Sequence, residues 1–340
     1  MFSKSKIKQG LNCDRALYYS VYKKFLAKYS ETSQQAFKRG TDIGDFARES
    51  FPDGGLVVGV RRDDKLLRTK KALTLGVPVF EASFEWEETL VQVDILVPEN
   101  LGWKVIEVKS GTSVKDDYLL DLAIQFLVLK NQTNESINFT SFNLWLVNKD
   151  SLDKTNLFKE VDITAQVTAK AEEIKPLVLD LIKKIKENKE PNTPVGSQCF
   201  YPYECPFISH CWKKVVDKHK TVLVLPPDQK AQFLKNKILY LDQTNLDKTI
   251  IETLEKKEVF IKPEEIKAKV FTSEPVSFLK VHTRMNSYPE HGLPPYSKIP
   301  WGFSIKTEDT EEAVIFSGDN FNSQAFWEAL QPMLSSKVVT

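Results

Sequence analysis

The chain has 340 residues, of which 47 are Lys or Arg and 46 are Asp or Glu, so its net charge is only +1. This length is enough for two domains and a sizeable hydrophobic core. The first residues, MFSKSKIKQGLNC, lack the apolar core of a secretory signal, and no apolar run reaches membrane-spanning length. We therefore expect a cytoplasmic protein that contacts no membrane and whose four cysteines form no disulfide framework.

The charges are unevenly distributed over the first 150 residues. Residues 1–75 carry 16 Lys and Arg against 8 Asp and Glu, a net +8, whereas residues 76–150 carry 5 against 12, a net −7. A basic segment beside an acidic one suits a surface that binds a polyanion next to carboxylates that bind a cation. Ordinary solvated helices would show the same imbalance, so both interpretations stay open.

Helices are predicted for most of the first 75 residues. The apolar pattern favours them in three regions, residues 3–28 (with a break after Gly10), 33–51 and 61–75. Gly40 and Gly44 lie inside the second region, where each glycine costs about 1 kcal/mol relative to alanine. We therefore expect a neighbour or a ligand to approach that backbone closely.

Three strands are predicted next, over residues 79–86, 90–97 and 103–109. We expect Glu87 and Glu88 to form a two-residue turn between the first two strands, although this pair is not a favoured hairpin sequence.

The hairpin places two carboxylates opposite each other. If Trp86 pairs with Thr89, the same register pairs Glu81 with Asp94, and directly opposed side chains lie about 5 Å apart. Two carboxylates at that distance repel each other unless a proton or a metal lies between them.

Glu107 and Lys109 stand two residues apart on the third strand, so their side chains point to the same face with Val108 between them. A carboxylate and an ammonium in so apolar a run cost several kcal/mol unless they pair or hold an ion. A Glu–Lys salt bridge would explain these two residues alone, but Asp94 on the preceding strand favours an ion site.

The following elements complete an α/β core. An amphipathic helix is predicted over residues 115–130, with Gln125 inside its apolar stretch, and a fourth strand over 139–147. A long helix over 164–188 is expected to break or kink at Pro176. Because the composition changes after Val222, we expect one domain over residues 1–220 and a second, α+β domain over 221–340.

The cysteines form a pattern of one plus three. Cys199, Cys205 and Cys211 are separated by five residues each, among prolines and aromatic residues, and Cys13 is the fourth cysteine of the chain. Thiolates held in this way bind zinc or an iron–sulfur cluster, and His210 could replace one of them. The alternative is that all four are small buried hydrophobic residues.

Several of these residues resemble the motifs of a known superfamily. Asp94, then Glu107-Val108-Lys109, then Gln125 in the following helix are similar to the PD-(D/E)XK nucleases of the RecB branch. The cysteine pattern resembles the iron–sulfur members, which are AddB-type helicase–nucleases and the CRISPR adaptation nucleases. The stretches SKSKIKQGLNCDRALYY, GTDIGDFARESFP, DLAIQFLVLK and GSQCFYPYECPFISHCW look most like a bacterial family that fuses such a nuclease to a DEDD-type exonuclease domain. The resemblance covers roughly residues 1–215.

The resemblance implies a restriction-endonuclease-like αβββαβ core around a central mixed sheet. Asp94, Glu107 and the Val108 carbonyl would hold Mg²⁺ or Mn²⁺. Lys109 would orient or activate the attacking water, and Gln125 would support the site or contact DNA. The chemistry agrees, because hard oxygen ligands suit Mg²⁺ and a nearby lysine stabilises developing negative charge.

The resemblance also implies further ligands. Glu81 would be an additional carboxylate. The histidine that the RecB pattern often has four residues after a glycine is replaced by Gly44, so Glu49 or Asp45 would stand in for it. The four cysteines would hold a 4Fe–4S cluster, with zinc as the alternative occupant.

The C-terminal part departs from the resembled family. The stretch LKVHT has Lys280 and His282 where that family has the first two metal-binding acids, which implies a shortened, inactive remnant that contacts a protein partner. The implied function is a metal-dependent DNA nuclease acting on single strands or duplex ends. The alternative is a non-catalytic nucleic-acid-binding or assembly protein that retains the nuclease fold and the cluster.

Overall fold

The computed structural model describes residues 1–132, 137–216, 220–256, 276–290, 292–306, 311–315, 323–333 and 337–339. The chain divides into two compact units. Unit 1 comprises residues 1–147 with 158–255, and unit 2 comprises residues 148–157 with 256–340. Within the described ranges, no helix is long and apolar enough to cross a membrane.

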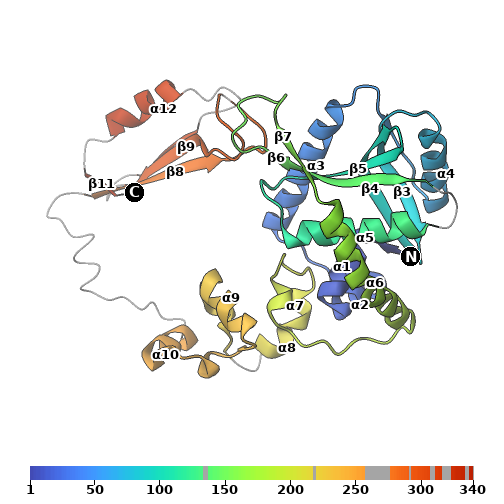
Figure 1. Cartoon of the computed structure of the whole chain (residues 1–340). Coiled ribbons are helices and arrows are strands. Elements are labelled where there is room, and N and C mark those ends of the chain that lie inside the picture. The colour runs from blue at the N-terminus through green and yellow to red at the C-terminus, as the bar shows by residue number, and fades with distance from the viewer. Residues whose placement is uncertain are drawn as a thin grey trace. The chain divides into compact units, whose positions relative to one another are not determined.

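Unit 1 is an α/β structure built on a mixed sheet with the strand order β2-β3-β4-β5-β6-β7, to which β1 adds beside β4 (Figure 1). β3, β4 and β5 are antiparallel neighbours, whereas β6 runs parallel to β5. The predicted order of helix, three strands, helix and strand is confirmed. The strands are β1 (Phe2–Ser3), β2 (Gly55–Leu56), β3 (Val79–Trp86), β4 (Thr89–Glu99), β5 (Gly102–Lys109), β6 (Phe139–Val147) and β7 (Phe158–Asp162).

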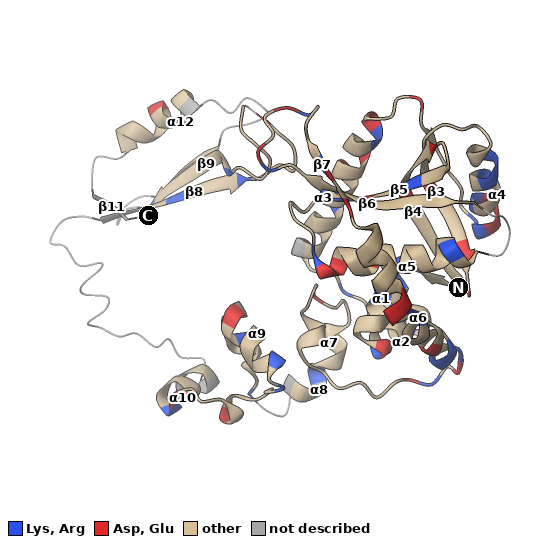
Figure 2. Ribbon diagram, viewed as in Figure 1, with Lys and Arg blue, Asp and Glu red and all other residues tan. Residues whose placement is uncertain are grey.

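Helices cover both faces of this sheet. Val105 belongs to a core shared with α5 and α6, whereas its neighbour Ile106 packs with Ala47 of α3, and consecutive strand residues point to opposite faces. α4 is densely basic, because five of its residues are Lys or Arg. Much of its ribbon is blue in Figure 2. The helices up to residue 256 are α1 (Lys4–Asn12), α2 (Asp14–Tyr22), α3 (Glu31–Glu49), α4 (Arg62–Leu73), α5 (Asp116–Asn131), α6 (Thr164–Lys186), α7 (Ile208–Cys211), α8 (Lys213–Val216), α9 (Pro227–Lys235) and α10 (Lys248–Lys256).

The β3–β4 hairpin has the predicted two-residue turn and register, with Trp86 paired to Thr89. Both turn residues, Glu87 and Glu88, have left-handed backbones with φ of 45° and 59°. This is the geometry of a type I′ turn, which matches the twist of the two strands. Since Glu-Glu is a poor sequence for such a turn, the buried residues of β3 and β4 hold the register.

α6 runs without a break from Thr164 to Lys186, so the predicted break at Pro176 is wrong. Val167, Ala171, Ile174 and Val178 form a buried stripe on either side of the proline, and α6 packs along α5. Burial of these side chains outweighs the roughly 3 kcal/mol that a proline costs inside a helix.

The division between the units differs from the boundary expected at residue 220. It falls near residue 255, because the segment after Val222 packs on the cysteine segment. Trp212 and Cys199 share a buried cluster with Val222, Leu225 and Leu234. The change in composition after Val222 therefore marks no boundary between units.

Unit 2 is an α+β structure whose sheet has the strand order β10-β9-β8-β11. Phe326 and Leu330 of its helix pack on Phe303 of β9. Lys280 and His282 lie on β8. The elements are β8 (Val276–Arg284), β9 (Ile299–Lys306), β10 (Glu311–Ile315), α12 (Ser323–Leu330) and β11 (Lys337–Val339).

Candidate functional site

Asp94 lies where β4 parts from β5. The two strands pair as far as Ile95 and Ile106, and beyond that point Asp94 Oδ2 accepts the backbone N–H of Val108 at 2.8 Å. The carboxylate therefore replaces a backbone acceptor that the diverging strand no longer offers. This hydrogen bond fixes Asp94 against the backbone of the residue that follows Glu107.

Glu107 is the most enclosed carboxylate of the site, with 2% of its side chain exposed. Its Oε1 accepts from Lys109 Nζ and from Lys4 Nζ, each at 2.7 Å. Its Oε2 accepts from Gln125 Nε2 on α5. The structure thus brings Asp94, Glu107, Lys109 and Gln125 together.

Lys4 reaches the site because of the short strand before it. β1 pairs with β4 at Phe2–Thr89 and Ser3–Leu90, along the stretch where β5 has moved away from β4. α1 begins at the next residue, so Lys4 projects from its first turn toward Glu107. Lys4 therefore reaches Glu107 at the point where β4 and β5 no longer pair.

A second layer of charged groups lies behind Lys109. Lys109 Nζ also donates to Asp121 Oδ2 of α5 at 2.6 Å. Lys8 Nζ lies 3.1 Å from the same Asp121 oxygen and donates to Asp117 Oδ2 at 2.7 Å. Ion pairs thus connect the basic first segment to the acidic second one, which accounts for part of the uneven charge distribution.

Tyr203 links this layer to the cysteine segment. Its hydroxyl donates to Asp117 Oδ2 at 2.8 Å, and Lys8 Nζ lies 5.5 Å from the centre of its ring. Tyr203 stands between Cys199 and Cys205 in sequence. A movement of the cysteine segment can therefore shift Lys109, because Tyr203 is connected to it through Asp117, Lys8 and Asp121.

Burial and neighbouring charges set the protonation states. Burial and the nearby Glu107 carboxylate raise the pKa of Asp94 to about 7. Burial alone would raise the pKa of Glu107, but the Lys109 and Lys4 ammonium groups together lower it. Burial lowers the pKa of both lysines, but the carboxylates of Glu107, Asp121 and Asp94 together raise it above the usual value, so both lysines remain charged.

The composition of the site fits a bound cation. The carboxyl groups of Asp94, Glu107, Asp117 and Asp121 number four, against the three ammonium groups of Lys4, Lys8 and Lys109, which leaves one net negative charge when Asp94 is ionised. In addition, Gln125 Oε1 is buried without a hydrogen-bond partner. Hard oxygen donors with excess negative charge suit Mg²⁺ or Mn²⁺.

Lysines hold Glu107, Asp117 and Asp121 in ion pairs. Among the described residues, no group of three or more His, Cys, Asp or Glu side chains is arranged to hold a single metal ion. A metal at Asp94 and Glu107 would therefore displace at least one lysine contact.

The hairpin ladder is interrupted at Glu81, so the predicted pairing of Glu81 with Asp94 is not formed. Phe80 pairs with Ile95 and Ala82 with Val93, but Glu81 between them has φ of 57°. For a residue with a Cβ this conformation costs about 1–2 kcal/mol. Strain of this kind occurs mainly at functional sites. Glu81 is half-buried, and burial raises its pKa.

The end of α3 supplies a cation to Glu81. Arg48 Nη1 donates to Glu81 Oε1 at 3.4 Å, and the same guanidinium pairs with Asp45. Glu49 is exposed at the last position of the helix. The structure therefore places Arg48, and neither Asp45 nor Glu49, against the additional carboxylate.

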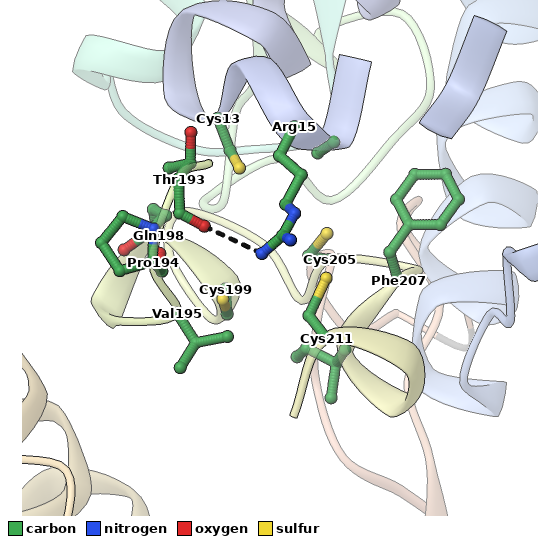
Figure 3. Close-up of a pocket in the computed structure, with 12 residues that line it drawn as sticks. Cys13, Arg15, Thr193, Pro194, Val195, Gln198, Cys199, Cys205, Phe207 and Cys211 are labelled. Atoms are coloured by element: carbon green, nitrogen blue, oxygen red, sulfur yellow. Dashed lines mark hydrogen bonds between the residues drawn. The ribbon is translucent and has the colours of Figure 1, made fainter. Parts of the chain in front are cut away.

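All four cysteines border one pocket (Figure 3). Cys199 and its two partners come from the segment after α6, while Cys13 is the residue between α1 and α2. Arg15 lies among them and donates to the Thr193 carbonyl at 3.2 Å. No His, Asp or Glu belongs to the lining, and His210 instead packs edge-on against Tyr19.

Burial governs the ionisation of the thiols in this pocket. Burial raises the pKa of Cys205 to about 12 and that of Cys211 to about 11, and each cysteine nearby adds to the rise. Cys13 caps α2, where the N–H groups of Ala16 and Arg15 oppose the effect of burial on its pKa. A four-thiolate donor set is what an iron–sulfur cluster or zinc requires.

A carboxylate clamp holds the two cysteine-bearing segments together. Glu190 accepts hydrogen bonds from Tyr19, Lys23 and Arg15 of the α2 region. Asn12 donates to the carbonyls of Gln198 and Tyr201. Polar contacts on two sides of the pocket therefore join the segments that carry the cysteines.

The sequence analysis did not identify Lys4, Lys8, Asp121 or Tyr203. The helical spacing carries a signal, because Lys4 and Lys8, like Asp121 and Gln125, are four residues apart and so share a helix face. No comparable signal exists for Tyr203.

A scan against models of known protein families finds no match to this chain, and a search of curated proteins finds no relative.

Proposed function

We propose that this protein is a metal-dependent nuclease with a restriction-endonuclease-like core, which hydrolyses phosphodiester bonds of DNA. The observation that carries the proposal is the convergence of Asp94, Glu107 and Lys109 in one buried cluster with one carboxylate in excess. Such a cluster would stabilise a fold poorly, because buried charges gain little over well-packed apolar side chains. The presence of such a cluster in the core therefore supports a chemical role.

Asp94 and Glu107, with the Val108 carbonyl, would hold one Mg²⁺ or Mn²⁺. The bound ion would neutralise charge on the phosphoryl oxygens and lower the pKa of a water. Lys109 stays an ammonium, so its role is to hold the attacking water and stabilise negative charge, not to accept a proton. Gln125 keeps Glu107 Oε2 oriented.

Fixed cations take the place of a second metal in this proposal. Lys4 contacts Glu107, and Arg48 contacts Glu81, at the two positions that flank Asp94. Both cations can neutralise phosphate oxygens without being recruited from solution. We therefore propose a mechanism with one divalent ion.

The cysteine pocket would hold a 4Fe–4S cluster that ties the start of α2 to the segment after α6. The cluster would be a structural clamp, since it would join Cys13 to Cys199, which lie 186 residues apart in the sequence. Iron and acid-labile sulfide in anaerobically purified protein test this assignment. A colourless protein with stoichiometric zinc would reject it.

The proposed activity is tested with end-labelled single- and double-stranded DNA, with and without Mg²⁺ or Mn²⁺. Asp94→Asn and Lys109→Met should each lower the cleavage rate by about 10²-fold or more while the fold is retained. Lys115→Met is the matched control, since Lys115 is exposed outside the cluster. Cleavage that survives both substitutions would refute the assignment. Metal-independent DNA binding without cleavage would instead favour the non-catalytic alternative.

A further inference from the structure

The first half of α3 is an exposed helix with aromatic residues on its surface. Phe37 is 60% exposed, and its ring lies edge-on to that of Tyr29, 53% exposed, at a centroid distance of 5.7 Å. Phe25, in the turn before them, is 82% exposed. Isolated helices of this length need packing to be stable, so a helix surface with large exposed rings is suited to a binding partner.

Basic residues accompany each of these rings in the sequence. Lys24 precedes Phe25, Lys28 precedes Tyr29, and Lys38 follows Phe37. Within the described part of the chain, none of these three lysines has a carboxylate partner, unlike Lys4 and Lys8 in the candidate site. We call Phe25, Tyr29 and Phe37 with these three lysines the aromatic–lysine surface.

One face of α3 leads from this surface to the candidate site. Phe37, Gly40, Gly44 and Arg48 are spaced by three or four residues and share that face. A Cβ added to either glycine would meet no atom of the described structure within 4 Å. The two glycines are therefore not required for packing within this structure, and the face that they open ends at the Arg48–Glu81 contact.

We propose that the aromatic–lysine surface binds a single strand of nucleic acid, which then follows the glycine-bearing face of α3 to the candidate site. This inference rests on the proposed nuclease function and specifies its substrate as single-stranded. The rings offer stacking faces for bases, and the unpaired lysines complement the phosphates. A duplex would present no unstacked base to the rings, so it would use only the lysines.

The distance between Phe37 and Arg48 sets the shortest oligonucleotide that can contact both the aromatic–lysine surface and the candidate site. Phe37 and Arg48 are 11 residues apart, which is about 16 Å along a helix axis. At about 3.4 Å per stacked nucleotide, this distance corresponds to about five nucleotides. Oligonucleotides shorter than this should lose the contribution of the rings.

The test is a binding titration of fluorescent oligonucleotides of about 15 nucleotides with the full-length protein in EDTA, which prevents cleavage. The double variant Tyr29→Ala, Phe37→Ala should bind single strands about tenfold or more weakly, because each base stack contributes about five- to a hundredfold. Binding of a duplex of the same length should change less than twofold. DNA and RNA strands are titrated separately to identify the sugar.

A second pair of variants separates binding from folding. Gly40→Leu adds bulk to the proposed face and removes a helix glycine, so it should retain thermal stability and still weaken single-strand binding. Gln35→Leu adds the same side chain to the opposite face of α3 and should bind like the wild type.

Cleavage assays distinguish failure of this inference from failure of the proposed function. A protein that cleaves DNA while the aromatic and Gly40 variants bind single strands normally overturns the inference alone. Equal losses for single strands and duplexes also overturn it. Absence of both binding and metal-dependent cleavage in the wild type would overturn the two proposals together.

Discussion

The Tyr203 hydroxyl donates a 2.8 Å hydrogen bond to Asp117, which joins the cysteine segment to the charged cluster around Glu107. From Asp117 the contacts continue through Lys8 and Asp121 to Lys109, with donor–acceptor distances between 2.6 and 3.1 Å. The position of Lys109 therefore depends on a loop whose own position would depend on the occupant of the cysteine pocket.

Tyr203→Phe should break the connection between the cysteine segment and the charged cluster around Glu107 while leaving both intact. Asp117 would keep Lys8 but lose its neutral donor, and a hydrogen bond to a charged group contributes about 1.5–3 kcal/mol. We expect metal-dependent cleavage to fall about three- to tenfold with unchanged iron content. Tyr201→Phe, two residues earlier and exposed, should leave the rate unchanged. Equal rates for Tyr203→Phe and the wild type would show that the link is not used.

Lys4→Met should lower the cleavage rate at least about tenfold. The substitution removes one of the two ammonium groups on Glu107 Oε1 and the fixed cation that we assign in place of a second metal. Lys6→Met, two residues later in the first turn of α1, is the control, because its side chain forms no ion pair with the cluster among the described residues. Full activity of Lys4→Met at saturating Mg²⁺ would contradict the one-metal proposal.

Glu81→Gly should increase stability and decrease activity. Glycine adopts the left-handed conformation of residue 81 without strain, so the free energy of unfolding should rise by about 0.5–1 kcal/mol, after allowance for the loss of the half-buried Arg48 pair. Glu87→Gly relieves the same kind of strain in the hairpin turn, away from the site, and should raise stability without affecting cleavage. A Glu81→Gly variant that is less stable than the wild type would show that the ion pair outweighs the strain.

The central acids could be predicted from the sequence because the signals were local. Strand alternation placed Glu107 and Lys109 on one face, and the two-residue turn gave the pairing of Trp86 with Thr89. The periodicity of α5 located Gln125. Each of these inferences needed only neighbouring residues or a two-residue turn.

The cations of the site could not be predicted, because contacts between residues far apart in the sequence bring them to the acids. Lys4 depends on β1, a strand of two residues with no alternation to detect, which pairs with the far end of the hairpin. The left-handed backbone of Glu81 could not be predicted from its residue type either. It lies where the β2–β3 pairing ends and the β3–β4 pairing is interrupted. The division between the units near residue 255 could not be predicted for the same reason, because the packing of Val222 on Trp212 is a contact that the sequence does not reveal.

Glu190 should make the closure of the cysteine pocket sensitive to acid. Hydrogen bonds from Lys23 and Tyr19 lower the pKa of Glu190 from its usual 4.5 to about 2. A carboxylate with a lowered pKa in the folded state stabilises the protein above its unfolded-state value, and this stabilisation is lost as the pH falls from about 4.5 toward 2.

Denaturant unfolding of the wild type and of Glu190→Gln between about pH 6 and pH 2 measures this contribution. The variant should be less stable at pH 6, and the difference should shrink toward zero as Glu190 of the wild type becomes protonated. Glu187→Gln, an exposed neighbour, should follow the wild-type curve at every pH. Because all three proteins carry the same cysteines, loss of a bound cluster in acid would affect them alike. A constant difference between Glu190→Gln and the wild type across this range would show that the carboxylate charge does not hold the clamp.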